Sequence, residues 1–153
     1  MQSSDPARIA LLDVNVLIAL LDPQHVHHNA AHHWFANQVP IGWATCPLTQ
    51  NCVLRILGNP RYPNNPGSPA TVMPLLDGLL AHPAHVFWPD DLSWSVDALI
   101  QGDQVLGHGQ ITDTYLLALA VYHQGFLASF DTRLSTLAVK GGRQALRLVP
   151  AQI

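Results

Sequence analysis

The chain has 153 residues, of which 48% are hydrophobic and 11% are charged, and its formal net charge at pH 7 is −3. This length is typical of one domain that buries its own core, so we expect a single domain over residues 1–153. The negative balance excludes a protein that coats nucleic acid through overall positive charge, because phosphate backbones are attracted to cationic surfaces.

The cysteines and the amino terminus favour a cytoplasmic protein. Cys46 and Cys52 do not have the spacing of a Cys-x-x-Cys motif and are expected to be reduced, partly buried thiols. The start of the chain lacks a cationic segment followed by a long apolar one, and Asp13 and Asn15 interrupt the longest apolar run near it. We therefore expect neither secretion nor membrane insertion.

Apolar periodicity and turn residues predict alternating strands and helices in the first half of the chain. The predicted elements are a buried strand over residues 9–12, helices over 14–21 and 27–38, a strand over 41–46, and a helix that Thr49 caps and that runs to residue 57. Asp22-Pro23, Pro40 and Gly58-Asn59-Pro60 end the three helices. The stretch 59–69 is rich in proline, asparagine and glycine and is expected to be a surface loop.

The second half continues the same alternation. The predicted elements are a helix over 71–81, a short strand over 85–88, a helix over 93–101 led by a Ser93 cap, a turn at 107–109, a strongly buried helix from 112 to 125, and strands over 126–130 and 146–149. This alternation indicates an α/β fold in which helices cover both faces of a mostly parallel sheet of about five strands.

Three aspartates occur where predicted strands end or helices begin. Asp13 follows the first strand, Asp131 follows the strand over 126–130, and Asp113 opens the buried helix. Ligands bind outside the carboxyl ends of the strands in open parallel sheets, so these residues can converge there on Mg²⁺ or Mn²⁺. Each aspartate also has a structural explanation. Asp13 can cap the helix after it, Asp131 a helix running through residue 137, and Asp113 is favoured by its own helix dipole.

Four segments together resemble a PIN domain. They are residues 11–19 (LLDVNVLIA), 49–55 (TQNCVLR), 112–120 (TDTYLLALA) and 129–131 (SFD). More narrowly, the chain is similar to the toxin subunits of virulence-associated toxin–antitoxin pairs, which are numerous in mycobacteria; His28, Trp34 and the stretch 87–90 also fit this subgroup. The similarity extends from about residue 9 to residue 149 and preserves the order of the motifs. It implies a PIN-like fold with three α/β/α layers.

The resemblance implies an acidic quartet that binds Mg²⁺ or Mn²⁺ and cleaves RNA. Carried over by position, Asp13, Asp113 and Asp131 are the metal ligands and three of the four catalytic residues. The fourth position, normally Glu, is occupied by Gln50, or by Asn51 if the alignment shifts by one. A Gln side chain keeps a carbonyl oxygen that can coordinate a cation or its water, but it has no negative charge and cannot act as a base.

Other polar residues are expected to support this site. Asn15 and Thr112 are predicted to orient the metal ligands. Arg55, Arg133 and Arg143 are candidate contacts to the RNA backbone, with ordinary solvated surface charge as the alternative for each.

The resemblance also implies partners, namely a homodimer and a cognate antitoxin whose carboxyl-terminal segment lies along a groove and blocks the acidic site. A hydrophobic content of 48% agrees with apolar surface that a partner covers, and equally with a large core. We therefore predict a metal-dependent endoribonuclease that is the toxin of a type II toxin–antitoxin system. Because the second acid is missing, the alternative is a catalytically weakened PIN domain that mainly binds RNA or its antitoxin.

Two further sites are possible on the residues alone. His25, His27, His28, His32 and His33 form a cluster in which His28 and His32, four residues apart on one helix, can face the same way and bind a transition metal. Surface and packing histidines are the simpler interpretation. A phosphatase of the haloacid dehalogenase type also places Asp after the first strand, but it requires a second Asp where Asn15 stands and a suitably placed lysine.

Overall fold

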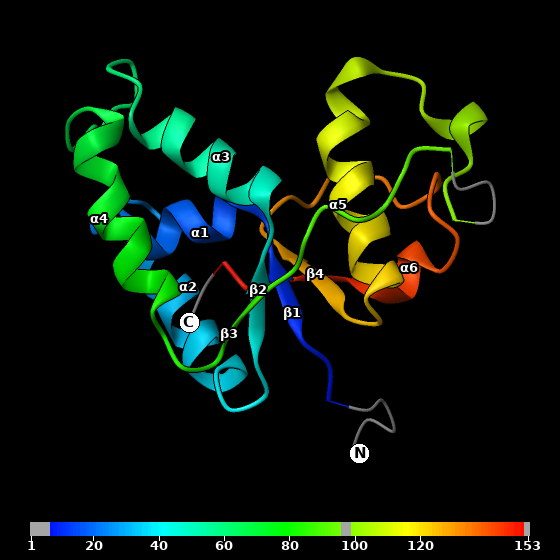
Figure 1. Cartoon of the computed structure of the whole chain (residues 1–153), viewed down its shortest axis with the longest axis horizontal. Helices are drawn as coiled ribbons and strands as arrows, with labels where there is room; N and C mark the ends of the chain where they lie inside the picture. Colours follow the sequence, from blue (N-terminus) through cyan, green and yellow to red (C-terminus); the bar gives the residue numbers. More distant parts are fainter. Residues whose placement is uncertain (1–6, 96–98, 152–153) are drawn as a thin grey trace.

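The computed structural model describes residues 7–95 and 99–151, which form an α/β structure around a parallel sheet (Figure 1). The strands are β1 (Ala10–Leu12), β2 (Trp43–Thr45), β3 (His85–Phe87), β4 (Phe126–Ser129) and β5 (Leu146–Leu148). Their order is β3-β2-β1-β4-β5, and every neighbouring pair is parallel. The predicted parallel sheet of about five strands is confirmed.

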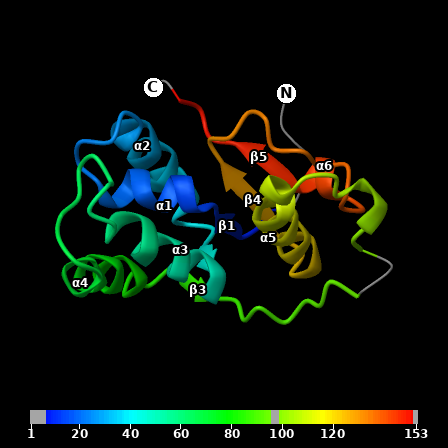
Figure 2. The ribbon, with the colours of Figure 1, turned by 90° about the horizontal axis from the view of Figure 1, so that it is seen from above.

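Helices cover both faces of this sheet. They are α1 (Val14–Leu21), α2 (His28–Gln38), α3 (Pro47–Leu57), α4 (Pro69–Leu80), α5 (Ile111–Tyr122) and α6 (Gly142–Ala145), with short 3-10 turns η1 (Gly102–Gln104) and η2 (His108–Gln110). Helices α1 to α4 lie on one face and α5 and α6 on the other (Figure 2), so the predicted three layers are present. Within residues 7–95 and 99–151, no helix is both long and apolar enough to cross a bilayer.

Alternating side chains of the strands form two hydrophobic cores. In β1, Ala10 and Leu12 belong to the core under α1 to α4, whereas Leu11 between them belongs to the core under α5. In β4, Phe126 and Leu127 divide in the same way. Successive strand residues point to opposite faces, and a parallel sheet that is buried on both faces therefore needs apolar residues throughout. This explains why these strands read as continuous apolar runs.

Two predicted helices, over residues 93–101 and 131–137, are absent from the described part of the structure. In place of a helix over 93–101, residues 93–95 form a turn and Ile100 makes an antiparallel bridge with Val139; residues 96–98 lie outside the described part of the chain. Two backbone hydrogen bonds extend this pairing. The Gln101 N–H donates to the Ala138 carbonyl, and the Lys140 N–H donates to the Leu99 carbonyl. Residues 131–137 also form no helix, so Asp131 is not a helix cap. Its Oδ1 accepts a hydrogen bond from the Arg133 backbone N–H in a local turn.

The start of α3 also differs from the prediction. The helix begins at Pro47, and Cys46, not Thr49, is the residue before it. The Thr49 hydroxyl instead accepts a hydrogen bond from the Cys46 N–H and donates one to the Cys46 carbonyl, both at 3.0 Å. Proline is favoured at the first position of a helix because its missing N–H would be unpaired there anyway. The earlier start places Gln50 in the first turns of α3, directly beyond β2.

Candidate active site

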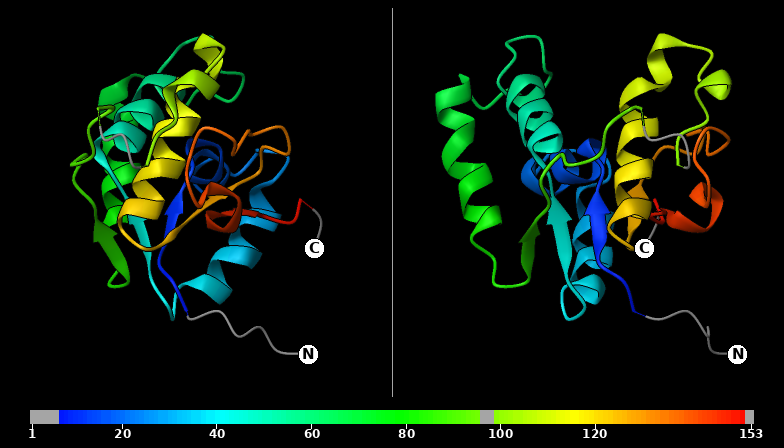
Figure 3. Two further views of the ribbon diagram at one scale, coloured as in Figure 1. Left: turned by 90° about the vertical axis from the view of Figure 1, so that its right-hand side faces the viewer. Right: turned by 45° about the vertical axis from the view of Figure 1, so that its right-hand side comes forward.

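The carboxyl ends of β1, β2 and β4 meet at one edge of the sheet. Asp13 directly follows β1, Ser129 ends β4, and α3 begins two residues after β2. Both views in Figure 3 show α1 and α3 leaving the sheet at this edge. Because the three strands are parallel neighbours, side chains from positions far apart in the sequence gather here.

Asp13 is the most buried carboxylate of this edge, with 5% of its surface exposed. Its Oδ1 accepts a hydrogen bond from the Val14 N–H and its Oδ2 accepts one from the Ser129 hydroxyl, each at 2.7 Å. Burial raises the pKa of Asp13; the two hydrogen bonds partly offset this effect and the nearby charge of Asp131 adds to it. Asp13 is also the N-cap of α1, so its structural role and its proposed metal-binding role coexist.

The Ser129 hydroxyl connects the ends of β1 and β4. Besides donating to Asp13, it accepts hydrogen bonds from Asn15 Nδ2 at 3.2 Å and from the Asp131 backbone N–H at 3.0 Å. The Asn15 Oδ1 atom in turn accepts from the Phe130 N–H at 3.2 Å. Asn15 thus acts on the carboxylates through Ser129. Sequence reasoning assigned Ser129 no role, although a lone hydroxyl that ends an apolar strand two residues before Asp131 was a usable signal.

Asp113 lies in the first turn of α5, half-buried and without a side-chain hydrogen bond to any described residue. Burial, together with the nearby charges of Asp13 and Asp131, raises its pKa to about 6. The three predicted carboxylates therefore share one electrostatic environment. Mutual repulsion of this kind is what a bound cation relieves.

The donor set suits a cation that keeps much of its water. Among the residues described, no three His, Cys, Asp or Glu side chains are placed so that they hold one metal ion together. Mg²⁺ retains several waters and binds through one or two carboxylates, so it does not require three direct protein ligands. Hard carboxylate, hydroxyl and amide oxygens are the donors present at this edge, and they fit Mg²⁺ or Mn²⁺ better than a soft metal.

Gln50 is held by the end of β2. Its Nε2 donates to Thr45 Oγ1 at 3.0 Å, and the same oxygen is hydrogen-bonded to His85 Nε2 at 2.7 Å. Burial lowers the pKa of His85, and a neutral His85 ring can accept the Thr45 proton. In that arrangement the Thr45 hydroxyl oxygen accepts a hydrogen bond from the Gln50 side-chain amide. The Gln50 carbonyl oxygen is then available as an acceptor or ligand. Asn51, the alternative occupant, is exposed.

The other predicted site residues, Thr112, Arg133 and Arg143, do not all lie at this edge of the sheet. Thr112 is half-buried in α5 and lines a separate surface pocket with Tyr115 and Asp90, without a side-chain hydrogen bond to a described residue. Arg133 is exposed two residues beyond Asp131. Arg143 lies in α6, which leads into the amino end of β5 and so sits at the opposite edge of the sheet. The structure does not bring Arg143 to the site.

The histidine cluster packs one helix onto another. His28 Nδ1 is hydrogen-bonded to the Ala19 carbonyl at 2.7 Å and His32 Nε2 to the Leu20 carbonyl at 2.9 Å, which attaches α2 to α1. His27 stacks on Phe130 with ring centroids 4.7 Å apart. One ring nitrogen of His28 and one of His32 contact backbone oxygens, which favours the interpretation of these residues as packing histidines over a transition-metal site.

Comparisons with known proteins show which family the chain is similar to. The family model for the PIN domain matches residues 10–140. Ribonuclease VapC44 of Mycobacterium tuberculosis is 43% identical over 136 residues, which cover 86% of this chain and 92% of that protein. Ribonuclease VapC39 of the same organism is 42% identical over 132 residues, covering 86% and 95%. Ribonuclease VapC38 is 36% identical over 143 residues, covering 92% and 98%.

A solved structure supports the fold. The crystal structure of VapBC2 from Rickettsia felis bound to a DNA fragment from their promoter aligns with a TM-score of 0.59 and 8% identity, covering 92% of this chain and 98% of that one. The match to the PIN family argues against the alternative of a haloacid dehalogenase-type phosphatase. The chain belongs to the PIN-domain family and, within it, has the VapC ribonucleases of Mycobacterium tuberculosis among its relatives.

Proposed function

We propose that this protein is an endoribonuclease, dependent on Mg²⁺ or Mn²⁺, that acts as the toxin of a type II toxin–antitoxin pair. The observation that carries the proposal is the set of three aspartates, Asp13, Asp113 and Asp131, whose charges interact at the carboxyl edge of the sheet. Relatives named ribonuclease VapC at 36–43% identity support the reaction class. The chain works as one cytoplasmic domain over residues 1–153.

Asp13 and Asp113 would hold the cation, with Asp131 acting through water. When bound, Mg²⁺ or Mn²⁺ lowers the pKa of a water and offsets charge that develops on the phosphate. The protein's own contribution is orientation. The Ser129 hydroxyl contacts the carboxylate of Asp13 and the backbone N–H of Asp131, so it fixes these two residues relative to each other. Asp113, with a pKa of about 6, is mostly ionised at neutral pH and available to a cation.

Gln50 is the observation that favours a second candidate function. Its amide takes the position where the family carries Glu, so the site has one negative charge fewer and a weaker attraction for a cation. A PIN domain weakened in this way would act mainly by binding RNA or its antitoxin. In either case, a cognate antitoxin that blocks the acidic edge and a homodimer are the partners we propose.

Cleavage of structured RNAs by the purified protein in Mn²⁺ tests the first proposal. We expect cleavage that is abolished by a chelator and reduced at least about 100-fold in Asp13→Asn, because loss of a metal ligand removes more than loss of an orienting residue. Binding of the same RNAs without cleavage in any divalent cation would instead support the second function. Cleavage that persists in both controls would contradict the metal-dependent mechanism.

A further inference from the structure

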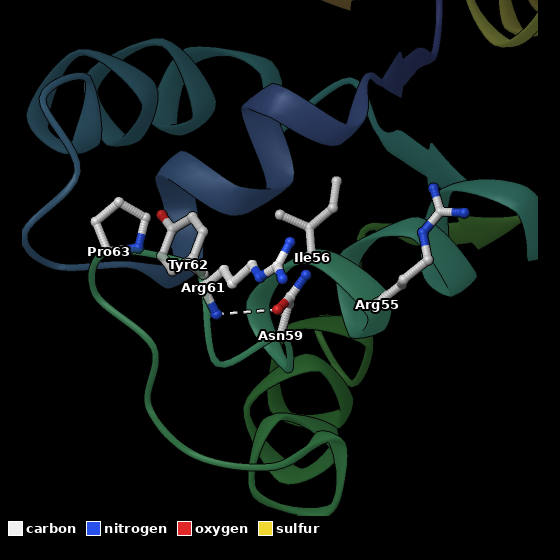
Figure 4. A pocket seen from close by; sticks show the side chains of 6 residues that line it. All are labelled: Arg55, Ile56, Asn59, Arg61, Tyr62 and Pro63. Atoms are coloured by element: carbon white, nitrogen blue, oxygen red, sulfur yellow. Dashed lines mark hydrogen bonds between the residues drawn. The ribbon is translucent and has the colours of Figure 1, made fainter.

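A surface pocket lies on the last turns of α3 and on the turn that follows. It has a volume of about 370 Å³ and is lined by Arg55, Ile56, Asn59, Arg61, Tyr62 and Pro63 (Figure 4). Two of these side chains are cationic and none is acidic. We propose that this pocket binds the phosphate backbone of a single-stranded stretch of the RNA substrate; the proposal rests on the proposed ribonuclease function.

The cationic groups of the pocket are not neutralised by carboxylates. The ion pair between His123 and Asp91 is the one salt bridge within residues 7–95 and 99–151. Arg55 contacts the Cys52 sulfur through Nη2 at 3.7 Å, and the Arg61 side chain makes no hydrogen bond to a described residue. A guanidinium group presents several N–H donors in a planar fork that matches two oxygens of a phosphate. Both arginines therefore keep donors for an anion.

The wall opposite Arg55 is aromatic and firmly anchored. The Tyr62 hydroxyl donates to Asp22 Oδ2 at 2.5 Å, and Asn64 Nδ2 donates to the same oxygen at 2.8 Å. Figure 4 shows Tyr62 and Pro63 at one end of the pocket and Arg55 at the other, with Arg61 and Ile56 between them. Nucleic-acid bases stack on aromatic rings next to arginines in single-strand binding sites. A wall that is already ordered reduces the entropic cost of binding.

The pocket lies at the carboxyl end of α3, whose first turns carry Gln50. Arg55 follows Gln50 by five residues on α3, which is about 7.5 Å along the helix axis. The aspartates repel phosphate and the chain carries a net charge of −3, so attraction for RNA has to come from a local cationic surface. Arg55 and Arg61, neither of which forms an ion pair with a described carboxylate, provide such a surface.

An acidic peptide is the alternative occupant. Its carboxylates could pair with the same guanidinium groups, but it has no base to stack on the ring of Tyr62. The combination of arginine with an exposed part of an aromatic ring therefore favours RNA.

Fluorescence anisotropy with a labelled oligouridylate of about 12 nucleotides tests the proposal. The full chain is titrated in EDTA, so that binding is measured without cleavage, for the wild type, Arg55→Gln, Arg61→Gln and the double variant. We expect the double variant to bind about tenfold or more weakly and the slope of log K against log salt to fall by about 1.4, since two phosphate contacts are lost. Lys140→Gln, which removes one positive charge from an exposed position just as each single arginine variant does, serves as control and should bind like the wild type.

The outcomes separate this proposal from the ribonuclease proposal. Weaker RNA binding by the double variant supports the pocket even if the wild type cleaves no RNA in Mn²⁺. Equal RNA binding by the double variant and the wild type, at an unchanged melting temperature, overturns the pocket even if RNA is cleaved. A poly-glutamate peptide whose binding depends on both arginines while RNA binding does not would overturn it in favour of an acidic partner.

Discussion

The Ser129 hydroxyl donates a hydrogen bond to Oδ2 of Asp13 over 2.7 Å, across 116 positions of sequence. Ser129 has no exposed surface and Asp13 has 5%. A buried carboxylate is costly unless its oxygens are hydrogen-bonded, so this contact contributes both to the stability of the sheet edge and to the orientation of the proposed metal ligand.

Ser129→Ala tests the two contributions together. The variant leaves one oxygen of Asp13 without its partner, and we expect a loss of about 1–3 kcal/mol in the free energy of unfolding. We also expect RNA cleavage in Mn²⁺ to fall by about 10- to 100-fold, as is typical when a group that orients a metal ligand is removed. Urea unfolding and a cleavage assay measure these effects. Ser68→Ala is the matched control, because Ser68 is exposed and its side chain makes no capping hydrogen bond. Unchanged RNA cleavage in Ser129→Ala would refute the orienting role of Ser129.

The pKa of Asp113 predicts how stability depends on pH. Its folded value of about 6 lies above the ordinary pKa of an aspartate, 3.8, so the folded state binds the proton more tightly than the unfolded state. Protonation therefore stabilises the fold, and this contribution declines as pH rises from about 4 to about 6. In EDTA, Asp113→Asn should flatten this part of the pH profile and raise the melting temperature at pH 7. Identical pH profiles for the two proteins would show that Asp113 is not destabilised by its neighbours.

The same titration predicts the pH dependence of activity with the opposite sign. Below about pH 6 the protonated Asp113 is neutral and attracts a cation less strongly, so RNA cleavage at a limiting Mn²⁺ concentration should fall. Excess Mn²⁺ should restore part of the lost rate, because cation binding competes with the proton. A loss of rate that Mn²⁺ does not reverse would assign the pH effect to another group.

The main features of the fold follow from the sequence because its apolar runs are long and regularly interrupted. The strands are buried on both faces, so residues such as Leu11 and Leu127 are apolar regardless of which face they point to. The failed predictions concern segments 93–101 and 131–137, where local capping residues suggested helices. Pairing of Ile100 with Val139 is non-local, and no local propensity reveals it.

The candidate site was predictable in its acidic residues and less so in its supporting contacts. Asp13, Asp113 and Asp131 follow from their positions at strand and helix ends. The contacts of Ser129 and Gln50 depend on which strands become neighbours, which is a property of the sheet order. Arg143 looked equivalent to Arg133 in the sequence, yet α6 carries it to the other edge of the sheet.

Replacing Gln50 with Glu tests whether the missing charge limits activity. Gln50→Glu adds a carboxylate next to the acidic edge, and we expect tighter Mn²⁺ binding together with RNA cleavage increased about tenfold or more, because opposite charges attract strongly at a partly buried site. Asn51→Asp places the same charge on the neighbouring exposed position and should change little. If Asn51→Asp were the activating variant, Asn51 would be the true counterpart of the second acid. No increase in either variant would show that the charge is dispensable.

Asp22 gives a prediction for the scaffold that is independent of catalysis. Burial by itself would raise the pKa of Asp22, but hydrogen bonds from Tyr62, Asn64 and the Gln24 N–H outweigh it and lower the pKa below 3.8. A lowered folded pKa contributes stability that is present above about pH 4 and is lost as pH falls through the folded pKa. Asp22→Asn should therefore cost about 2 kcal/mol at neutral pH and less under acidic conditions. Urea unfolding at pH 7 and pH 3 measures this loss, and Asp77→Asn, at an exposed aspartate on α4, is the control. If Asp22→Asn lost the same free energy of unfolding at both pH values, packing and not the carboxylate charge would anchor the turn at Tyr62.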